Sequence, residues 1–106
     1  MRLGSKIALV TGAGGGLGGA TAIRFATEGA KVVCSDIDLA KAEKTVSMIE
    51  SRGGTAIAHQ CDIADPAQCN AQVEEAITCF GRLDILVNSA GVSLHRLALD
   101  TTIEDW

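Results

Sequence analysis

The stretch VTGAGGGLGG at residues 10–19 follows directly on the apolar run IALV at residues 7–10. It holds six glycines within residues 12–19, although glycine weakens helices and strands alike. A glycine loop between a buried strand and a helix lets backbone N–H groups approach an anion, and the N-terminus of the helix adds partial positive charge. A side chain in the loop would block that approach. The stretch therefore predicts an anion-binding loop, and a loop that only packs a helix onto a sheet is the alternative.

Strands and helices alternate along the rest of the sequence. Short apolar or β-branched runs predict strands, and amphipathic stretches that end at glycine predict helices. The strands are predicted at residues 7–10, 31–35, 55–60 and 83–87. The helices are predicted at residues 17–28, at residues 40–52, and from Pro66 until Gly81. The TTIE stretch at residues 101–104 predicts the start of a fourth helix, because a hydroxyl cap is followed by an acid three residues on.

This alternation predicts the fold class. It is typical of parallel strands joined by right-handed crossovers. We therefore expect an α/β protein with a doubly wound parallel sheet, incomplete at about four strands and three helices. The second helix should turn Val46 and Ile49 inward, and the third should turn Val73, Ile77 and Phe80 inward.

The composition agrees with this fold class and argues against several kinds of partner. Of the 106 residues, 47% are hydrophobic but only 3% are aromatic, so the apolar content is mostly aliphatic, as in parallel sheets covered by helices. This length suits one domain. The net charge of -4 offers no basic surface to a nucleic-acid backbone or an anionic membrane. We therefore expect neither nucleic acid nor a membrane as partner.

The sequence also bears on compartment and metal binding. The apolar run after Lys6 is interrupted at Thr11 and Gly12, too early for a signal peptide or a membrane span, which predicts a cytoplasmic protein. The four cysteines have no C-x-x-C spacing, and we expect them to be reduced and structural. His59 and His95 have no nucleophile or motif beside them. We therefore predict no metal site and no catalytic histidine.

An acidic residue follows the second predicted strand. Asp36 stands eighteen residues past Gly18, where a carboxylate can accept hydrogen bonds from the ribose of an adenosine. An ordinary turn aspartate is the alternative. A nucleoside triphosphate loop, G-x-x-x-x-G-K-[ST], is excluded because Gly14 and Gly19 have the spacing but Ala20 stands in place of the lysine. The residues therefore favour a dinucleotide as ligand.

Three short motifs follow one another on the expected elements. They are TGAGGGLG at residues 11–18, CDI at residues 61–63 and NSAG at residues 88–91. Together they resemble the short-chain dehydrogenase/reductase family, which has T-G-x-x-x-G-x-G in its cofactor loop, an aspartate at the adenine and N-N-A-G after the fourth strand. Ser89 replaces the second asparagine of that last motif. The resemblance covers essentially the whole chain.

The resemblance implies a Rossmann-type sheet with strand order 3-2-1-4. Residues 1–106 would be the N-terminal part of a single NAD(P)-binding domain, without its C-terminal catalytic part. The glycine loop would hold the pyrophosphate, Asp36 the ribose, and Asp62 and Ile63 the adenine. Asp62 as an ordinary turn residue and Asn88 as a staple of the sheet are the alternatives. The implied cofactor-binding residues are Thr11, Gly12, Gly14, Gly15, Gly16, Leu17, Gly18, Asp36, Ile37, Asp62, Ile63, Asn88, Ala90 and Gly91.

The cofactor is expected to be NAD(H) rather than NADP(H). Asp36 would repel a 2′-phosphate, and no lysine or arginine lies between Gly12 and Gly19.

The family's catalytic residues are missing from this chain. They are a serine and a Y-x-x-x-K pair, in which the lysine lies on the same helix face as the tyrosine and lowers the phenol pKa. The chain contains no tyrosine, so no catalytic residue is assigned and the 106 residues alone are expected to be inactive. We expect the cofactor-binding fragment of an NAD-dependent oxidoreductase that acts on a small alcohol or carbonyl substrate and whose parent is a homo-oligomer. A non-catalytic dinucleotide sensor and a truncated remnant without function are the alternatives.

Overall fold

Four strands and three helices alternate in a computed structural model that describes residues 3–89. The strands are β1 (Ile7–Thr11), β2 (Lys31–Asp36), β3 (Thr55–Gln60) and β4 (Ile85–Asn88). The helices are α1 (Gly16–Thr27), α2 (Leu39–Ser51) and α3 (Pro66–Phe80). The strands are all parallel, in the order β3-β2-β1-β4. The α/β class and the strand order are therefore confirmed, whereas the helix start at residues 101–104 lies outside the described residues.

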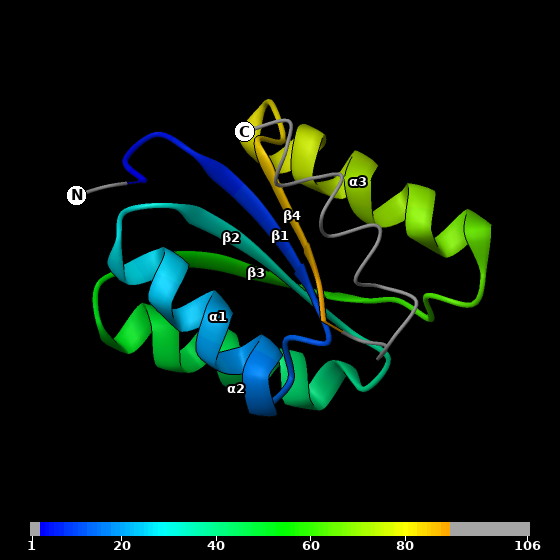
Figure 1. Ribbon diagram of the computed structural model, residues 1–106, viewed down its shortest axis with the longest axis horizontal. Helices are drawn as coiled ribbons and strands as arrows, with labels where there is room; N and C mark the ends of the chain where they lie inside the picture. Colours follow the sequence, from blue (N-terminus) through cyan, green and yellow to red (C-terminus); the bar gives the residue numbers. More distant parts are fainter. Residues whose placement is uncertain (1–2, 90–106) are drawn as a thin grey trace.

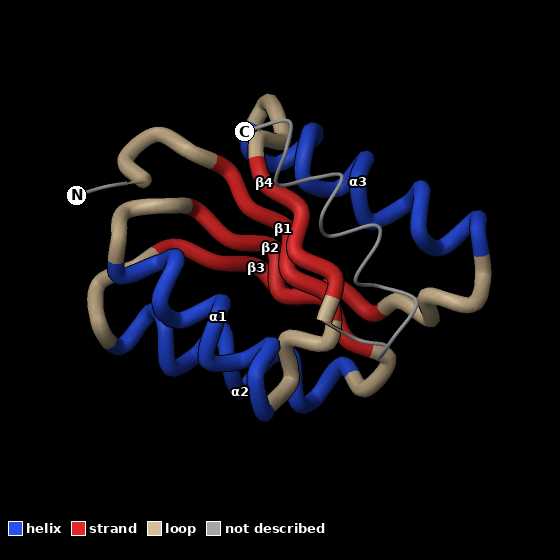
Figure 2. The backbone as a smooth tube through the Cα atoms, viewed as in Figure 1, coloured by secondary structure: helices blue, strands red, loops and turns tan. Residues whose placement is uncertain are grey.

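The molecule has three layers (Figure 1). The helices α1 and α2 cover one face of the sheet, and α3 covers the other, as Figure 2 shows in its helix and strand colours. Because the strands are parallel, their carboxyl ends gather at one edge. There Thr11 pairs with Ser35 on one side and with Asn88 on the other, and Asp36 pairs with Gln60. The glycine loop also leaves the sheet at this edge.

The ends of α2 and α3 follow from local sequence. Asp38 caps α2, because its side chain accepts a hydrogen bond from the Lys41 N–H at 3.3 Å. Asp65 caps α3 in the same way, and Pro66 stands at the first turn, where its missing N–H has no cost. Gly81 ends α3 with a φ of 89°, which favours glycine.

The face covered by α1 and α2 holds the larger core, and we call it the α1/α2 face. The α2 side chain of Ile49 is 1% exposed, and Val46 of the same helix packs beside this core, as the sequence predicts. Aliphatic side chains of β1 and β2 fill the space between sheet and helices. The buried residues of this face are Ala8, Val10, Ala13, Ala22, Ala30, Val32, Cys34, Ala42, Ile49, Ala56, Ile85 and Val87.

The face covered by α3, which we call the α3 face, is less complete. Its fully buried residues are Leu9, Val33 and Ala76, with Val73 and Phe80 of α3 partly buried against them. The prediction that Ile77 points inward is wrong, since that side chain is 48% exposed. Ala76 lies at the centre of the contact between α3 and the sheet. Ile77 is the next residue of the helix and lies about 100° further round its axis, away from that contact.

The fourth strand begins two residues later than predicted. Asp84 lies ahead of Ile85 and makes two bonds to Ile7 of β1: its N–H donates to the Ile7 carbonyl oxygen at 2.9 Å, and its carboxylate accepts the Ile7 N–H at 2.8 Å. Leu83 packs against the α3 face from outside the strand.

All four cysteines are free, with Cys34 and Cys61 buried. Cys79 is exposed on α3, so the expectation of a structural role does not extend to it. Within residues 3–89, no helix has the length and apolar content needed to cross a membrane.

Candidate functional site

The glycine loop joins β1 to α1 at the carboxyl edge of the sheet (Figure 1). Gly12 and Gly16 have φ values of 65° and 56°, the left-handed region that glycine enters without strain. Gly15 stands at the N-cap of α1, which has no side-chain cap. The first N–H groups of α1 are therefore free of a capping side chain, the arrangement in which an anion binds at a helix N-terminus.

Two glycines of the loop are fixed by close packing. A Cβ at Gly18 would lie 2.0 Å from the Gly12 carbonyl oxygen and 2.6 Å from the Ser89 Oγ. A Cβ at Gly14 would lie 2.6 Å from the Asp36 Oδ2. The first contact brings α1 against the end of β1, and the second brings the loop against the end of β2. Close packing at these two positions therefore fixes the path of the loop.

The exits of β1 and β4 are bonded to one another. The Thr11 hydroxyl donates to the Asn88 Oδ1 at 2.7 Å and accepts the Ser89 N–H at 3.1 Å. The Ser89 hydroxyl donates to the Thr11 carbonyl oxygen. Asn88 therefore does staple the sheet, and Ser89 makes its own bonds to β1 where the family motif has asparagine. Ala90 and Gly91 lie outside the described residues.

Asp36 connects the loop, the sheet and the start of α2. Its Oδ2 accepts the Gly14 N–H at 2.8 Å, and its Oδ1 accepts the Asp38 N–H at 2.9 Å. Its backbone carbonyl accepts the Cys61 N–H at 3.1 Å. The carboxylate is therefore both a turn former and a side chain held at the glycine loop. Its two oxygens retain further acceptor sites.

One hollow of about 230 Å³, which we call the first hollow, opens beside Asp36. It brings together six of the predicted cofactor-binding residues, among them Asp36, Asp62 and Ile63, which the resemblance assigns to the ribose and the adenine. Its lining residues are Thr11, Gly12, Ser35, Asp36, Ile37, Cys61, Asp62 and Ile63.

Asp62 lines this hollow and also shapes its wall. Its N–H donates to the Gln68 Oε1 at 2.8 Å, and its Oδ1 accepts the Ala64 N–H at 3.0 Å. The turn role that the sequence left open for Asp62 is therefore present together with its place at the hollow.

Buried polar groups support the floor of the first hollow. The Ser35 hydroxyl donates to the Gln72 Oε1 at 2.7 Å, and both side chains are buried. Burial raises the pKa of the Cys61 thiol to about 11, with a further contribution from the Cys69 thiol. Cys61 is thus uncharged at neutral pH. Gln72 is a residue that sequence reasoning missed, because a glutamine in a helix has no signal that separates a buried role from a solvated one.

A second hollow, of about 460 Å³, lies between the glycine loop and α2. The α2 helix also holds the loop directly, since the buried Thr45 hydroxyl donates to the Ala13 carbonyl oxygen at 2.7 Å. Sequence reasoning missed Thr45 and the two lysines of this hollow. Their spacing along α2 is the signal that could have found them, because residues three and four apart share a helix face. The lining residues are Gly12, Gly14, Gly15, Gly16, Asp36, Lys41 and Lys44.

Three of the predicted residues line neither hollow: Leu17, Gly18 and Asn88. Leu17 is 78% exposed in the first turn of α1. Asn88 points its side chain into the hydrogen bond with Thr11.

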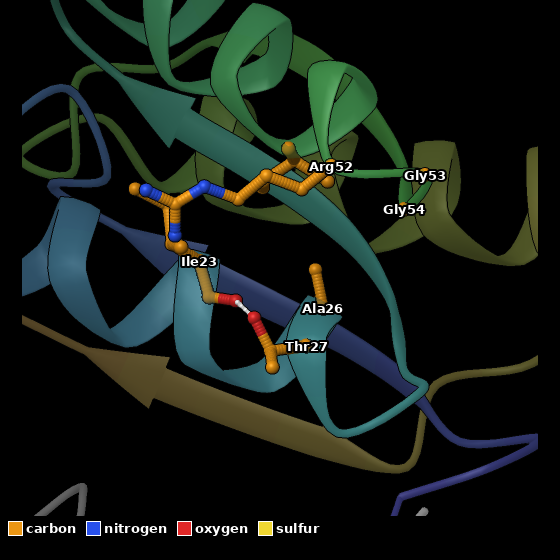
Figure 3. A pocket seen from close by; sticks show the side chains of 7 residues that line it. Ile23, Ala26, Thr27, Arg52, Gly53 and Gly54 are labelled. Carbon is orange, nitrogen blue, oxygen red and sulfur yellow. Dashed lines mark hydrogen bonds between the residues drawn. The ribbon is translucent and has the colours of Figure 1, made fainter.

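A groove of about 270 Å³ lies at the other end of α1, away from the glycine loop. Figure 3 shows Arg52 at the end of α2 and the Thr27 hydroxyl, which donates to the Ile23 carbonyl oxygen at 2.9 Å. Ala26, Ile49, Gly53 and Gly54 complete the lining. None of the predicted site residues contributes to this groove.

The remaining polar candidates do not form a site in the described part of the chain. His59 is partly buried in β3 and lines neither hollow, and His95 lies beyond residue 89. Among residues 3–89, no three His, Cys, Asp or Glu side chains are grouped so that they could hold a metal ion.

The chain belongs to the short-chain dehydrogenase/reductase family, and it matches the short chain dehydrogenase family over residues 6–106. It is 40% identical over 105 residues to a D-threitol dehydrogenase of Mycolicibacterium smegmatis, covering 99% of this chain and 40% of that protein. It is 47% identical over 91 residues to the 7α-hydroxysteroid dehydrogenase of Escherichia coli K12, covering 86% of this chain and 36% of that protein. The chain thus spans about two fifths of the length of these relatives.

A solved structure shares the fold. It is a 7α-hydroxysteroid dehydrogenase complexed with NADH and 7-oxo glycochenodeoxycholic acid. The match has a TM-score of 0.81 at 47% identity and covers 82% of this chain and 34% of that one.

Proposed function

We propose that this chain is the NAD(H)-binding part of an oxidoreductase that interconverts a secondary alcohol and its ketone. The observation that carries the proposal is the Asp36 carboxylate, which accepts the Gly14 N–H at 2.8 Å and lies where the two hollows meet. A dinucleotide needs such a junction, because its ribose lies between its adenine and its phosphates.

The packing of the glycine loop fits a dinucleotide. At Gly14 and Gly18 a Cβ would collide with neighbouring atoms, so this edge of the sheet offers backbone in place of side chains. The N–H groups at the start of α1 would bind the pyrophosphate, and Asp36 would accept hydrogen bonds from the ribose hydroxyls. Ile37, Asp62 and Ile63 would surround the adenine. Bound at this edge, the nicotinamide would accept or donate a hydride.

NAD(H) is proposed over NADP(H) because of the charge of Asp36. Two unit charges about 4 Å apart repel by roughly 4 kcal/mol at an effective dielectric near 20, and solvent reduces that figure.

The proton of the alcohol would be exchanged by a serine and a tyrosine–lysine pair that these 106 residues do not contain, since the chain has no tyrosine. The relatives act on D-threitol or on a 7α-hydroxysteroid according to their names. We extend only the class of substrate, an alcohol or a carbonyl compound, to the parent of this chain. We also propose that this parent is a homo-oligomer.

Two measurements test the proposed function. Calorimetric titration of the chain with NAD+ and NADP+ should show binding of NAD+ that is at least tenfold tighter. Equal or tighter binding of NADP+ would contradict the cofactor assignment. In the second, nicotinamide absorbance is followed with secondary alcohols for the 106 residues and for a longer chain that supplies a serine and a Y-x-x-x-K pair. Turnover is expected from the longer chain only, and turnover by the 106 residues would show that another group here transfers the proton.

A further inference from the structure

Two cysteines lie side by side next to the first hollow. Cys61 follows β3, lines that hollow and is 2% exposed, whereas Cys69 stands near the start of α3. They are eight residues apart in the sequence, yet their thiols lie within hydrogen-bonding reach of one another. The proposed function uses neither thiol.

The turn between β3 and α3 holds the two cysteines in place. The Cys69 Sγ donates to the Ile63 carbonyl oxygen at 3.3 Å, and the Cys69 N–H donates to the Asp65 carbonyl oxygen at 3.1 Å. The Cys61 N–H donates to the Asp36 carbonyl oxygen at 3.1 Å. Backbone hydrogen bonds therefore fix both residues while their sulfurs meet, which is the arrangement that a disulfide needs.

The two thiols differ in exposure and in charge. Cys69 is partly exposed, so an oxidant in solvent reaches it, whereas Cys61 is buried. Burial, and after it the charge of a Cys69 thiolate, raises the pKa of the Cys61 thiol to about 11. Cys61 therefore keeps its proton at neutral pH, and the thiolate is the form of cysteine that attacks an oxidant. These differences indicate that Cys69 reacts first and Cys61 second.

We propose that Cys61 and Cys69 are a redox pair, which a hydroperoxide oxidises to an intramolecular disulfide that reshapes the wall of the first hollow. The Cys69 sulfur attacks the peroxide, so that an S–O bond forms, the O–O bond breaks and the departing oxygen leaves as an alcohol or water. The Cys61 sulfur then attacks the sulfur of this sulfenic acid, and the hydroxyl group leaves as water with the Cys61 proton. Two thiols are oxidised, and one peroxide is reduced by two electrons.

The disulfide would change the first hollow at two points. Cys69 loses the proton that it donates to the Ile63 carbonyl oxygen, and the Cys61 sulfur is drawn toward α3. Cys61, Asp62 and Ile63 line the hollow where the adenine is proposed to bind. Oxidation should therefore weaken binding of the adenine half of the cofactor. Only this consequence rests on the proposed function, because the disulfide forms without a nucleotide.

The test detects the disulfide directly. Cys79→Ser provides the background chain, because it removes an exposed thiol that would link two chains. The folded chain is treated with hydrogen peroxide, and its intact mass falls by about 2 Da for a disulfide but rises by about 16 Da for a sulfenic acid. A protease that cuts before aspartate separates the two cysteines at Asp62 and Asp65, so the disulfide joins two peptides. Calorimetry measures binding of 5′-AMP before and after oxidation, and circular dichroism checks that the chain stays folded.

We expect the loss of about 2 Da, a pair of peptides joined through Cys61 and Cys69, and binding of 5′-AMP that is weaker by about threefold or more until dithiothreitol restores the thiols. In the same background, Cys61→Ala should stop at a sulfenic acid on Cys69, and Cys69→Ser should leave Cys61 unoxidised. A folded chain that forms no disulfide, or that joins either cysteine to Cys34, would overturn the inference. A disulfide that leaves 5′-AMP binding unchanged would overturn its effect on the hollow. A reduced, folded chain that binds no 5′-AMP would instead refute the proposed function, while the mass measurement would still decide the redox pair.

Discussion

The two faces of the sheet differ in how completely they are covered. Within residues 3–89, the α1/α2 face buries twelve core residues, and the α3 face buries three. The same strands serve both faces, with Val10 and Leu9 as neighbours in β1 on opposite sides. On the α3 face, Ile77 stays 48% exposed although it belongs to a helix that contacts the sheet.

The difference explains where the candidate site is built. The loop, Asp36 and the lysines all depend on α1 and α2, whose packing holds the loop against β2. The α3 helix contributes from the opposite face of the sheet, through the hydrogen bond between Ser35 and Gln72. The glycine loop and Asp36 therefore rest on the better-packed part of the molecule.

The largest effect is expected at Gly18. Gly18→Ala would place a methyl group 2.0 Å from the Gly12 carbonyl oxygen, which is backbone and cannot move aside alone. We expect a loss of more than about 3 kcal/mol in the free energy of unfolding, above the usual cost of overpacking. Urea denaturation followed by circular dichroism measures it.

The matched control is Gly15→Ala in the same loop. A Cβ there meets nothing within 4 Å, and the backbone is extended with a φ of 171°. Its effect should be within about 0.5 kcal/mol. If both variants lowered the free energy of unfolding equally, close packing of α1 against β1 would not determine the conformation of the loop.

Two isoleucines compare the two faces directly. Ile49→Ala empties a position that is 1% exposed on the α1/α2 face, and it should cost about 2–5 kcal/mol. Ile77→Ala, on α3, removes a side chain that is 48% exposed, and it should change stability by about 0.5 kcal/mol or less. Denaturation midpoints of both variants check this. If Ile77→Ala proved as costly as Ile49→Ala, the α3 face would be packed as tightly as the other.

Much of the fold could be predicted from the sequence because the local signals agree with each other. Aliphatic runs, the Asp65 cap with Pro66, and the glycine that ends α3 give each element a start or a stop. The error at Ile77 has a physical cause. The sequence shows how wide the apolar stripe of a helix is, but the part of the stripe that becomes buried depends on the surface that the helix packs against. The α3 helix contacts the sheet through Ala76, so the adjacent Ile77 lies outside the buried part.

The site was predicted less completely than the fold. Glycine spacing and Asp36 were visible because each has a local requirement, a left-handed turn or a carboxylate at a strand end. Lys41 and Thr45 reach the loop only because α2 returns against it, which is tertiary packing. Their spacing places them on one face of α2, but it does not show whether that face meets the loop or solvent.

Alkaline pH should weaken the α1/α2 face through a buried thiol. Burial raises the pKa of Cys34 to about 12 from an ordinary value of 9.0. Above pH 9 the unfolded chain loses this proton while the folded chain keeps it, so stability falls as pH rises toward 12. At pH 10 the loss is about 1.4 kcal/mol from this thiol. Thermal denaturation between pH 8 and pH 10 measures it.

Cys34→Ala should make that decline shallower by the same amount. Cys79→Ala is the control: partial desolvation and the nearby Glu75 carboxylate raise the pKa of this thiol too, but Cys79 is exposed on α3, so its removal should change the decline less than Cys34→Ala does. If both variants kept the full alkaline decline, the buried thiol would not be its cause.

The smallest effect is expected at Asp84. This residue bonds the start of β4 to the start of β1, at the end of the sheet away from the glycine loop. Partial desolvation raises its pKa, but the Ile7 N–H and the Arg82 guanidinium, at 2.8 Å and 2.9 Å, more than offset this and leave the pKa below its usual value. The stability it contributes is therefore present above the ordinary carboxyl pKa and is lost as pH falls through the lowered one. Asp84→Asn keeps an acceptor but loses the charge, so we expect a loss of about 1 kcal/mol at pH 7 that disappears in acid. Urea denaturation of both chains at pH 7 and at pH 3 measures the difference. A loss that stays the same at both values would mean that the shape of the side chain, and not its charge, holds the β1–β4 edge.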